Sequence, residues 1–378
     1  MNKSLRTLKT KILHIPNYYP PHIGGIEGVC YSIVTALPEY EHQVICFNDQ
    51  RQTVRERYEG IPVTRCGVFG KLFSQSVSFS FIKELKRVFK KFKPDIVHFH
   101  APNPLSSVYL LLSLPKKTKL FVHWHSDIIE QNLLYFFYYP IERLLLRRAD
   151  KMLATSPSYI GGSKALLSCQ EKLTIVPNTV DVNQWKKQKG DDDAIREIKN
   201  RYEKKKIIFT CGRHVPYKGL RYLINAVPLI AENAVVVIAG EGPLSDELKK
   251  RAASLSTVYF VGRLSDDELR QYLYASDIYA FPSITRNEAF GIALAEAMYC
   301  GLPAVTFTIP FSGVNWLCLN GETGLESENG NVQAFADAIN RLLTADILRR
   351  KLGINATQRI KSHFTIEAVK KSLTEIYI

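Results

Sequence analysis

The chain has 378 residues, of which 46% are apolar, and it carries a formal net charge of +14 at pH 7. This length accommodates about two ordinary domains, each with a sizeable core. Seven scattered cysteines without C-x-x-C spacing argue against a disulfide framework and a zinc site. The apolar runs are too short or too interrupted to span a bilayer, and the basic N-terminus lacks a signal peptide's apolar core. We therefore expect a soluble two-domain protein that is not secreted.

Short segments rich in β-branched and apolar residues predict strands throughout the first half of the chain. They lie at residues 11–17, 42–48, 62–66, 95–100, 119–125, 151–156 and 173–178. Between them, residues 27–38 and 81–92 have the apolar spacing of helices. This half therefore alternates strands with helices.

The positive charge is concentrated in this first half. Residues 1–180 hold 24 Lys and Arg against 13 Asp and Glu, and the densest part is "IKELKRVFKKFKPD", residues 82–95. Its apolar residues have helical spacing and leave five lysines and an arginine on the other faces. Such a basic amphipathic helix either faces solvent or rests on anionic lipid headgroups. No nucleic-acid reader motif accompanies the charge, so we expect no nucleic-acid partner.

The second half repeats the alternation after a polar join. Residues 185–206 lack apolar runs and predict a linker plus a helix, with the aspartates at 191–193 as a solvated charge cluster and not a metal site. Strands are predicted at 206–212, 234–240, 258–262, 278–283 and 303–307, with helices at 219–232 and 266–276. The predicted fold class is α/β, with two doubly wound parallel sheets that carry function at the strands' carboxyl ends.

Three stretches are candidate ligand sites. The first is the pair Gly24 and Gly25, between a strand and a helix, where the backbone can approach an anion at a helix N-terminus. A plain tight turn explains the pair equally well. The second is "CGRHVPYKGL", in which Arg213 and Lys218 can grip a diphosphate and neutralise its charge as it leaves. Exposed surface cations are the alternative.

The third stretch is "RNEAFGIALAEAMYCGLP", residues 286–303. Glu288 falls in the loop after a strand, and a helix is predicted from near Phe290 to Cys300, ended by Gly301 and Pro303. Glu296 then lies about 8 Å further along the helix, so the two carboxylates are not a coupled acid pair. They suit two ends of one extended ligand, such as a nucleotide sugar. Otherwise Glu288 caps the helix and Glu296 belongs to its polar face, although that face is small and burying a lone carboxylate is costly.

These motifs together resemble the retaining glycosyltransferases of family 4. "GRHVPYKGL" precedes an E-x7-E signature in "SITRNEAFGIALAEAMYCGLPAV", "GGIEGV" matches the family's glycine loop, and the resemblance covers nearly the whole chain. It implies the GT-B architecture, two Rossmann-like domains facing across a cleft. The implied divisions are an acceptor-side domain at 1–185, a linker and connecting helix at 186–206, a donor-nucleotide domain at 207–360, and a C-terminal helix at 361–378 that crosses back toward the first domain.

The resemblance also implies roles for single residues. Arg213 and Lys218 match the cations that hold the donor diphosphate, and Glu296 matches the glutamate that binds the nucleotide ribose. Glu288 matches a catalytic position beside the transferred sugar. Three further positions match the surroundings of the donor phosphates: Gly25, Phe290 and Gly291.

A histidine is also expected at the donor sugar. His125, in "HWHSDIIEQ", matches a histidine often found there, with a catalytic role. His123 points to the same side of the strand, but His125 sits at the strand end and is preferred. A structural histidine in the core stays an open alternative.

The chemistry that the resemblance implies is sugar transfer with retention at the anomeric carbon. The leaving diphosphate accepts the acceptor's proton, so no enzymic nucleophile is needed. No D-x-D motif follows a strand, since "SDDE" at 265–268 has the pattern of a helix cap. We expect no metal and no cofactor beyond the nucleotide-sugar substrate.

The donor and acceptor follow from a narrower likeness. Residues 123–160 and "SGVNWLCLNGETGL" are similar to a branch with bacterial lipopolysaccharide and O-antigen transferases, many of which use GDP-mannose. Donors such as a UDP-hexose, UDP-GlcNAc or dTDP-rhamnose stay open, because this is a likeness to a subgroup. "FSGVNWL" also departs from the commoner pattern beside the diphosphate. The basic first half agrees with a polyprenyl-diphosphate-linked saccharide acceptor and an anionic membrane surface, which implies peripheral attachment at the inner face of the cytoplasmic membrane. The remote alternative is an inactive sugar-nucleotide or glycan-binding module.

Overall fold

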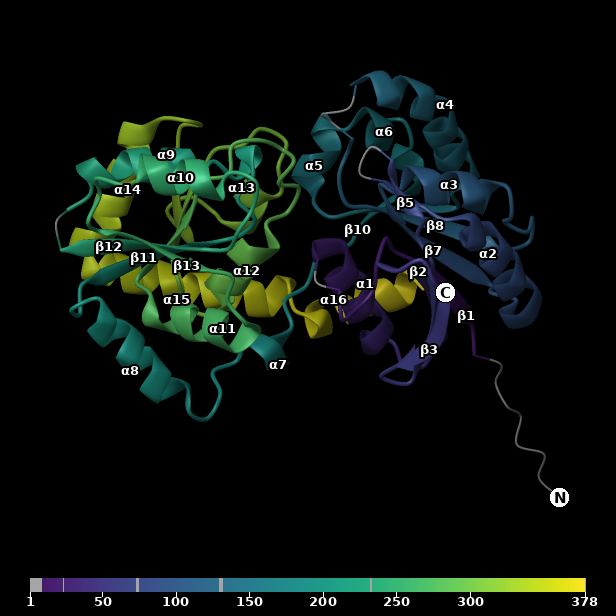
Figure 1. Ribbon diagram of the computed structural model, residues 1–378, viewed down its shortest axis with the longest axis horizontal. Helices are drawn as coiled ribbons and strands as arrows, with labels where there is room; N and C mark the ends of the chain where they lie inside the picture. Colours follow the sequence, from purple (N-terminus) through teal and green to yellow (C-terminus); the bar gives the residue numbers. More distant parts are fainter. Residues whose placement is uncertain (1–8, 23, 73–74, 129–131, 232, 378) are drawn as a thin grey trace. The chain divides into compact units, whose positions relative to one another are not determined.

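The computed structural model describes residues 9–22, 24–72, 75–128, 132–231 and 233–377, and these form two compact units (Figure 1). The first unit comprises the described residues up to Thr155, residues 163–176 and residues 370–377. The second comprises Ser156–Gly162 and Pro177–Val369. Each unit has its own sheet with helices on its faces (Figure 1).

The first unit is built on an eight-stranded sheet in the order β10-β9-β8-β7-β1-β2-β4-β3. All neighbouring strands are parallel except β3 and β4, which pair antiparallel. The strands are β1 (Lys11–Ile15), β2 (Glu41–Phe47), β3 (Val54–Tyr58), β4 (Ile61–Cys66), β7 (Ile96–Ala101), β8 (Lys119–Trp124), β9 (Lys151–Ala154) and β10 (Leu173–Ile175). The seven predicted strands are present. The prediction missed β3, "VRERY", because its three central residues are charged and exposed and only its two ends are apolar.

The strand order of the first unit reverses between β1 and β7, so the loops after these two strands meet at a switch point. The chain runs from β1 outward to β2 on one side, and β7 lies on the other side of β1. Ligands of such sheets bind outside the carboxyl ends of the strands at this reversal. Among its described residues the unit also contains a small hairpin, β5 (Gly70–Leu72) and β6 (Gln75–Val77), and six α-helices: α1 (Gly25–Ala36), α2 (Phe79–Phe92), α3 (Pro104–Leu111), α4 (Asn132–Arg148), α6 (Lys164–Leu167) and most of α16 (Ile366–Tyr377).

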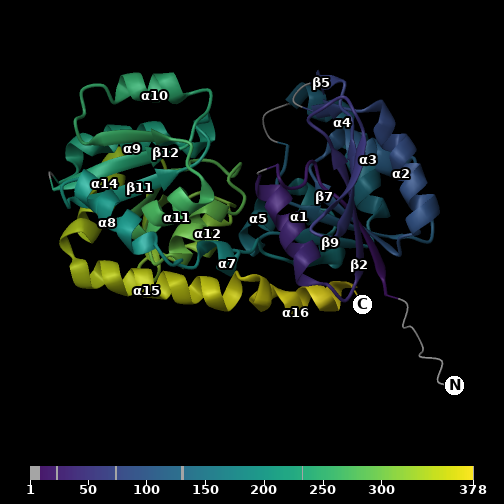
Figure 2. The same ribbon diagram turned by 60° about the horizontal axis from the view of Figure 1, so that its bottom comes forward.

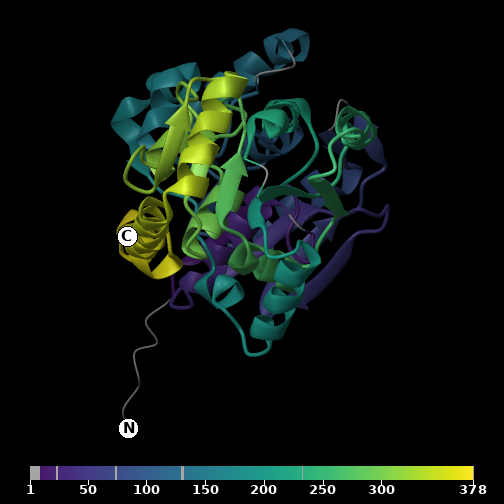
Figure 3. The same cartoon turned by 90° about the vertical axis from the view of Figure 1, so that its left-hand side faces the viewer.

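The second unit has a six-stranded, fully parallel sheet in the order β13-β12-β11-β14-β15-β16. Figure 3 turns this unit to the front. Its strands are β11 (Lys206–Cys211), β12 (Ala234–Ala239), β13 (Val258–Gly262), β14 (Ile278–Phe281), β15 (Ala304–Phe307) and β16 (Gly324–Ser327). Only β16, "GLES", was not predicted, because it is short and half polar. Here the strand order reverses between β11 and β14, so the loops after these two strands meet at the switch point. The α/β prediction of two doubly wound parallel sheets is confirmed.

In the described part of the chain, ten α-helices complete the second unit together with the start of α16. They are α5 (Pro157–Gly162), α7 (Val182–Trp185), α8 (Asp191–Arg201), α9 (Leu220–Ala226), α10 (Ser245–Arg251), α11 (Asp266–Ala275), α12 (Ile292–Tyr299), α14 (Val332–Thr344) and α15 (Asp346–His363), with the single turn α13 (Val314–Leu317) between α12 and α14. α11 begins with a capping box, in which Ser265 and Glu268 satisfy each other's backbone, as predicted for "SDDE". None of the described helices is both long and apolar enough to cross a membrane.

The aspartate run at 191–193 corrects a prediction. Asp192 and Asp193 face solvent, but Asp191 is buried and accepts hydrogen bonds from Nε and Nη2 of Arg270 at 2.9 and 3.1 Å. These hydrogen bonds lower the pKa of Asp191 to about 2. A solvated cluster was the wrong prediction for Asp191, because its partner lies 79 residues away in the sequence.

The C-terminal part of α16, from Lys370 onward, packs as part of the first unit (Figure 2). The Tyr377 ring stacks on Phe121, with ring centroids 5.8 Å apart. Nζ of Lys151 donates to the carbonyl oxygen of Ile376 at 2.6 Å. The last turns of the chain are thereby part of the first unit's core.

Candidate active site

The loops after β11 and β14 meet at the switch point of the second unit. The backbone N–H of Ile284 donates to the carbonyl oxygen of Tyr217 at 3.0 Å, which ties the two loops together. A small pocket lies between them, lined by residues 210–213, 218 and 220 from the first loop and 281–283 from the second. Gly219 makes this close approach possible: its φ is +63°, and a Cβ there would lie 2.0 Å from the carbonyl oxygen of Pro282.

Lys218 and Glu288 form an ion pair at this pocket. Nζ of Lys218 lies 2.5 Å from Oε2 of Glu288, and the hydroxyl of Ser283 donates to the same oxygen at 3.1 Å. Both charged side chains are largely buried, with exposed fractions of 15% and 11%. Burial alone lowers the pKa of Lys218, but the Glu288 carboxylate outweighs it and raises that pKa. Lys218 therefore stays charged, and the ion pair holds the two side chains together.

The loop that carries Glu288 is braced by the segment after β15. The hydroxyl of Ser312 donates to the carbonyl oxygen of Glu288, and the N–H of Gly313 donates to that of Ala289 at 2.8 Å. A Cβ on Gly313 would lie 2.5 Å from the same Ala289 oxygen. Sequence reasoning missed this brace, although the departure of "FSGVNWL" from the usual pattern marked the place.

Phe290 and Gly291 play different parts at the start of α12. The Phe290 side chain is buried against Trp316 and Phe364, so only its backbone can meet a ligand. Gly291 has a φ of +91°, which favours glycine, and it is the N-cap of α12. The first N–H groups of this helix are therefore available to an anion. The helix ends at Tyr299, before Gly301, close to its predicted end.

Glu296 is an unpaired carboxylate near the same pocket. It is half-buried and makes no hydrogen bond or ion pair with a described residue. Its pKa is raised to about 8, first by burial and then by the charge of Asp266, while Lys218 opposes the shift. Glu296 thus lies within electrostatic reach of Lys218, and Glu288 is not among the groups that shift its pKa.

Arg213 also stands without a partner in the described part of the chain. Its side chain is exposed at the rim of the pocket, where β11 has ended. Near the carboxyl end of its sheet, the second unit therefore groups two cations and two carboxylates. Lys218 and Glu288 are paired, whereas Arg213 and Glu296 have no partner among the described residues. This arrangement suits an extended anionic ligand that also carries hydroxyl groups.

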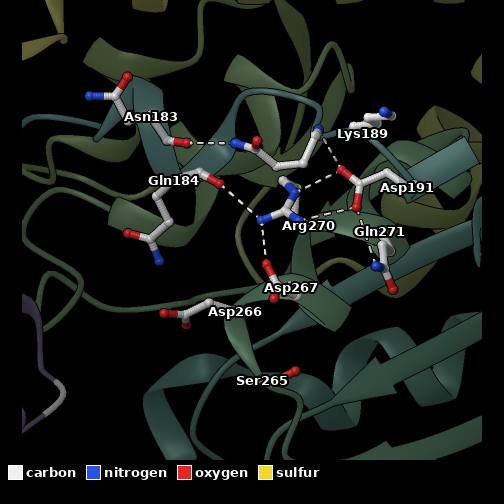
Figure 4. A pocket seen from close by; sticks show the side chains of 11 residues that line it. Asn183, Gln184, Lys189, Asp191, Ser265, Asp266, Asp267, Arg270 and Gln271 are labelled. Carbon is white, nitrogen blue, oxygen red and sulfur yellow. Dashed lines mark hydrogen bonds and ion pairs between the residues drawn. The ribbon is translucent and has the colours of Figure 1, made fainter.

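A larger polar pocket of about 880 Å³ lies in the same unit, between the start of α8 and the first turns of α11 (Figure 4). The Asp191–Arg270 pair forms part of its wall. Asp266 lines it as an exposed carboxylate that makes no ion pair with a described residue. The charge of Asp266 also raises the pKa of Glu296.

The remaining predicted residues belong to the first unit. Gly25 is the exposed first residue of α1, with open space where a Cβ would project. His125 follows β8 and is 6% exposed, and its Nε2 lies 3.0 Å from Nδ1 of His100. His123 is fully buried, with its ring stacked on that of His125 at 4.2 Å. Of the two histidines, His125 is the one that solvent reaches.

Two family descriptions match the chain, one in each half. Glycosyltransferase Family 4 matches residues 23–184, and Glycosyl transferases group 1 matches residues 191–359. O-antigen chain mannosyltransferase C of Escherichia coli is 28% identical over 97% of this chain and 98% of its own. D-rhamnosyltransferase WbpZ of Pseudomonas aeruginosa is 29% identical over 94% of this chain and 92% of its own.

Solved structures share the whole fold. Sucrose-phosphate synthase from Thermosynechococcus elongatus superposes with a TM-score of 0.82 at 20% identity, covering 98% of both chains. Anabaena HepE, solved in complex with UDP and glucose, gives a TM-score of 0.77 at 20% identity, covering 97% of this chain and 99% of its own. At these identities the likeness shows the fold alone.

Proposed function

Because the chain belongs to glycosyltransferase family 4, with the two Rossmann-like units of the GT-B fold, we propose that it transfers mannose from GDP-mannose to a lipid-linked saccharide. The product would serve the synthesis of a bacterial surface polysaccharide, either O-antigen or lipopolysaccharide. The observation that carries this proposal is the Lys218–Glu288 pair beside the exposed Arg213 and the unpaired Glu296. Cations for a diphosphate and carboxylates for hydroxyl groups are what a nucleotide sugar requires.

Each residue has a place in the proposed reaction. Lys218 and Arg213 hold the diphosphate with the first N–H groups of α12, Glu296 accepts hydrogen bonds from the ribose, and Glu288 lies beside the sugar. The bond from the anomeric carbon to the diphosphate oxygen breaks while the acceptor oxygen bonds to that carbon on the same face. The acceptor's proton passes to the leaving diphosphate, so the configuration is retained. Lys218 and Arg213 neutralise the negative charge of the leaving diphosphate, as a metal ion would, and we propose that no metal or cofactor is needed.

The choice of a guanine nucleotide is supported by Asp266. A carboxylate only accepts hydrogen bonds, and guanine presents two adjacent donors, its N1–H and its N2 amino group. Uracil offers only one N–H between two carbonyls. Asp266 lines the polar pocket and its charge raises the pKa of Glu296, so a guanine in this pocket would find a matching acceptor (Figure 4).

The choice of mannose is supported by the two relatives. One is named for mannose and the other for D-rhamnose, which is 6-deoxymannose. Both sugars therefore share the manno configuration and differ only at C6. The HepE structure contains glucose, but HepE resembles this chain in fold alone, so its sugar does not identify the donor of this chain.

Attachment to the cytoplasmic membrane surface is supported by two helices of the first unit. α2 buries most of its apolar residues, with Phe79 exposed at its start, and leaves Lys83, Lys86, Lys90 and Lys91 exposed, as the sequence predicts. α4 exposes large apolar side chains, with Phe136 at 73% and Phe137 at 69%. Exposed lysines attract anionic headgroups, and exposed aromatic rings favour the interfacial region. A polyprenyl-diphosphate acceptor would be presented at that surface.

Calorimetric titration of the full chain with a panel of nucleotides tests the donor part of this proposal. The panel contains GDP, UDP, ADP and dTDP, followed by GDP-mannose, UDP-glucose, UDP-GlcNAc and dTDP-rhamnose. We expect GDP and GDP-mannose to bind at least tenfold more tightly than the other nucleotides. Tighter binding of a uridine or thymidine nucleotide would overturn the GDP assignment, and no binding of any nucleotide would overturn donor binding altogether.

A further inference from the structure

Six histidines lie buried in the first unit, on four adjacent strands and at the end of one of them. They are His14, His42, His98, His100, His123 and His125. Burial lowers the pKa of every one of them, so each is neutral at pH 7 and carries a single ring N–H. A neutral imidazole donates through one nitrogen and accepts through the other. The hydrogen bonds between these rings therefore fix which nitrogen holds the proton.

One pair shows how this works without ambiguity. Nε2 of His42 lies 2.8 Å from the carbonyl oxygen of Leu37, which can only accept, so Nε2 carries the proton. Nδ1 of His42 must then accept, and it does so from Nε2 of His14 at 3.0 Å. Nδ1 of His14 is left as a buried bare nitrogen without a partner. In this pair the atom that lacks a partner is an acceptor and not an N–H.

The pair of His100 and His125 repeats the pattern. Nδ1 of His100 lies 3.0 Å from Nε2 of His125, and Nε2 of His100 is buried without a partner. Buried N–H groups without a partner are rarer than buried unused acceptors. If Nε2 of His100 is the bare nitrogen, its proton is on Nδ1, and that N–H donates to Nε2 of His125.

The second ring nitrogen of His125, Nδ1, is the last atom of this hydrogen-bonded pair to be assigned. Nδ1 of His125 has no hydrogen-bond partner among the described residues, and it is not among the fully buried atoms that lack one. It is therefore the ring nitrogen that solvent reaches. With Nε2 accepting from His100, the proton of His125 must sit on Nδ1.

We propose that His100 is a positioning residue that holds His125 as its Nδ1–H tautomer, so that His125 presents a hydrogen-bond donor, and not a proton acceptor, to the donor substrate. The group that it meets is then an oxygen with a free lone pair, on the sugar or on a phosphate. This inference rests on the proposed function in one respect: the contact of His125 with the donor, which the family resemblance implies, is part of the proposed transfer. The tautomer itself is a property of the free protein.

The tautomer is read directly by two-bond ¹H–¹⁵N spectra of the full chain labelled at histidine, recorded without substrate. We expect a protonated Nδ1 and a bare Nε2 on His125 in the wild-type protein and in His100→Asn, whose amide N–H takes the place of Nδ1. In His100→Leu the signal of His125 should shift to the other tautomer or to a mixture. A protonated Nε2 on His125 in the wild-type protein would overturn the proposal.

A double-mutant cycle supplies the kinetic test. We expect His100→Leu to lower kcat/KM for GDP-mannose by about tenfold, His100→Asn to restore most of the loss, and His100→Leu to cost nothing further once His125 is Leu. The control is His123→Leu: its ring stacks on His125 but bonds through Nδ1 to His98, so the tautomer of His125 should not change. Additive losses with unchanged thermal midpoints would contradict the proposal. If no donor is turned over at all, the proposed function fails, while the spectra still decide the tautomer.

Discussion

Nζ of Lys218 lies 2.5 Å from Oε2 of Glu288, which joins the loop after β11 to the loop after β14. The two residues are 70 positions apart in the sequence and come together only because β11 and β14 are neighbours at the switch point of the sheet. The pair fixes a cation where a diphosphate is proposed to bind and a carboxylate where the sugar is proposed to lie. Substituting Lys218 and Glu288 one at a time tests these two proposed contacts separately.

Removing either charge should slow the reaction by orders of magnitude. Lys218→Ala deletes a cation proposed to stabilise the leaving diphosphate, and Glu288→Gln keeps the shape but not the charge; we expect each to lower kcat by about 10²–10³. Initial rates of GDP release measure this, with the thermal midpoint as the check on folding. The control is Arg221→Ala, since Arg221 is exposed and its guanidinium lies over its neighbour Tyr222. Near wild-type rates in the two variants would remove the pair from the site.

Gly313 should be intolerant of any side chain. A Cβ would lie 2.5 Å from the carbonyl oxygen of Ala289, so Gly313→Ala must displace the loop that carries Glu288. A displacement of about 1 Å can cost about 10²-fold in rate, so we expect kcat to fall by at least tenfold. Gly70→Ala is the matched control, because open space surrounds its Cβ position. Full activity of Gly313→Ala would show that the brace does not position Glu288.

The raised pKa of Glu296 predicts a pH-dependent stability. Its folded-state pKa of about 8 lies above the ordinary value of 4.5, so between these values the unfolded chain releases the proton first and the unfolding free energy falls as pH rises. Glu296→Gln removes this loss. Its thermal midpoint without nucleotide should match the wild-type value near pH 4.5 and exceed it progressively up to pH 9, by roughly 2–4 °C for each kcal/mol.

The exposed Glu197 supplies the control for this comparison, because Glu197→Gln removes a carboxylate that solvent already surrounds. Its midpoint should differ from the wild-type value by the same small amount at every pH. A constant difference for Glu296→Gln as well would mean that Glu296 ionises normally in the folded protein.

Asp266 should select the base. Asp266→Asn replaces one acceptor oxygen by an amide donor, which opposes the donors of guanine, so we expect GDP affinity to fall by about tenfold while UDP affinity changes little. Calorimetric titration measures both. Asp246→Asn is the control, since Asp246 is an exposed acid in the first turn of another helix, α10. Equal losses for GDP and UDP would assign Asp266 to a general electrostatic effect.

The two helices proposed to contact the membrane surface, α2 and α4, should contribute in different ways to vesicle binding. Exchanging Lys83, Lys86, Lys90 and Lys91 for Gln should weaken binding to anionic vesicles at low salt, by about 1 kcal/mol for each charge, and the effect should fade at high salt. Phe136→Ser with Phe137→Ser should weaken binding at every salt concentration. Cosedimentation with vesicles of phosphatidylglycerol and phosphatidylcholine measures this. Lys249→Gln with Lys250→Gln, on α10 of the second unit, is the control. Unchanged binding would remove the helix concerned from the membrane contact.

Sequence patterns found those features that depend on neighbouring residues. The strands at β11 and β14, the glycine that ends α12 and the capping box of α11 all follow from local spacing and residue type. Local spacing does not reveal the pairing of Lys218 with Glu288, because that pairing depends on the order of strands in the sheet. The buried state of Asp191 was mispredicted, since Arg270 is remote in the sequence. The brace from Ser312 and the histidine partner of His125 were missed for the same reason.

The most direct test of the proposed function is transfer itself. The full chain is incubated with GDP-mannose and a set of polyprenyl-diphosphate-linked mono- and disaccharides, and the lipid product is examined by mass spectrometry and by NMR at the new anomeric centre. We expect one added hexose with the α configuration of the donor, formed equally well after treatment with a chelator. No transfer from GDP-mannose while another nucleotide sugar is used, or a product with the inverted configuration, would refute the proposed reaction.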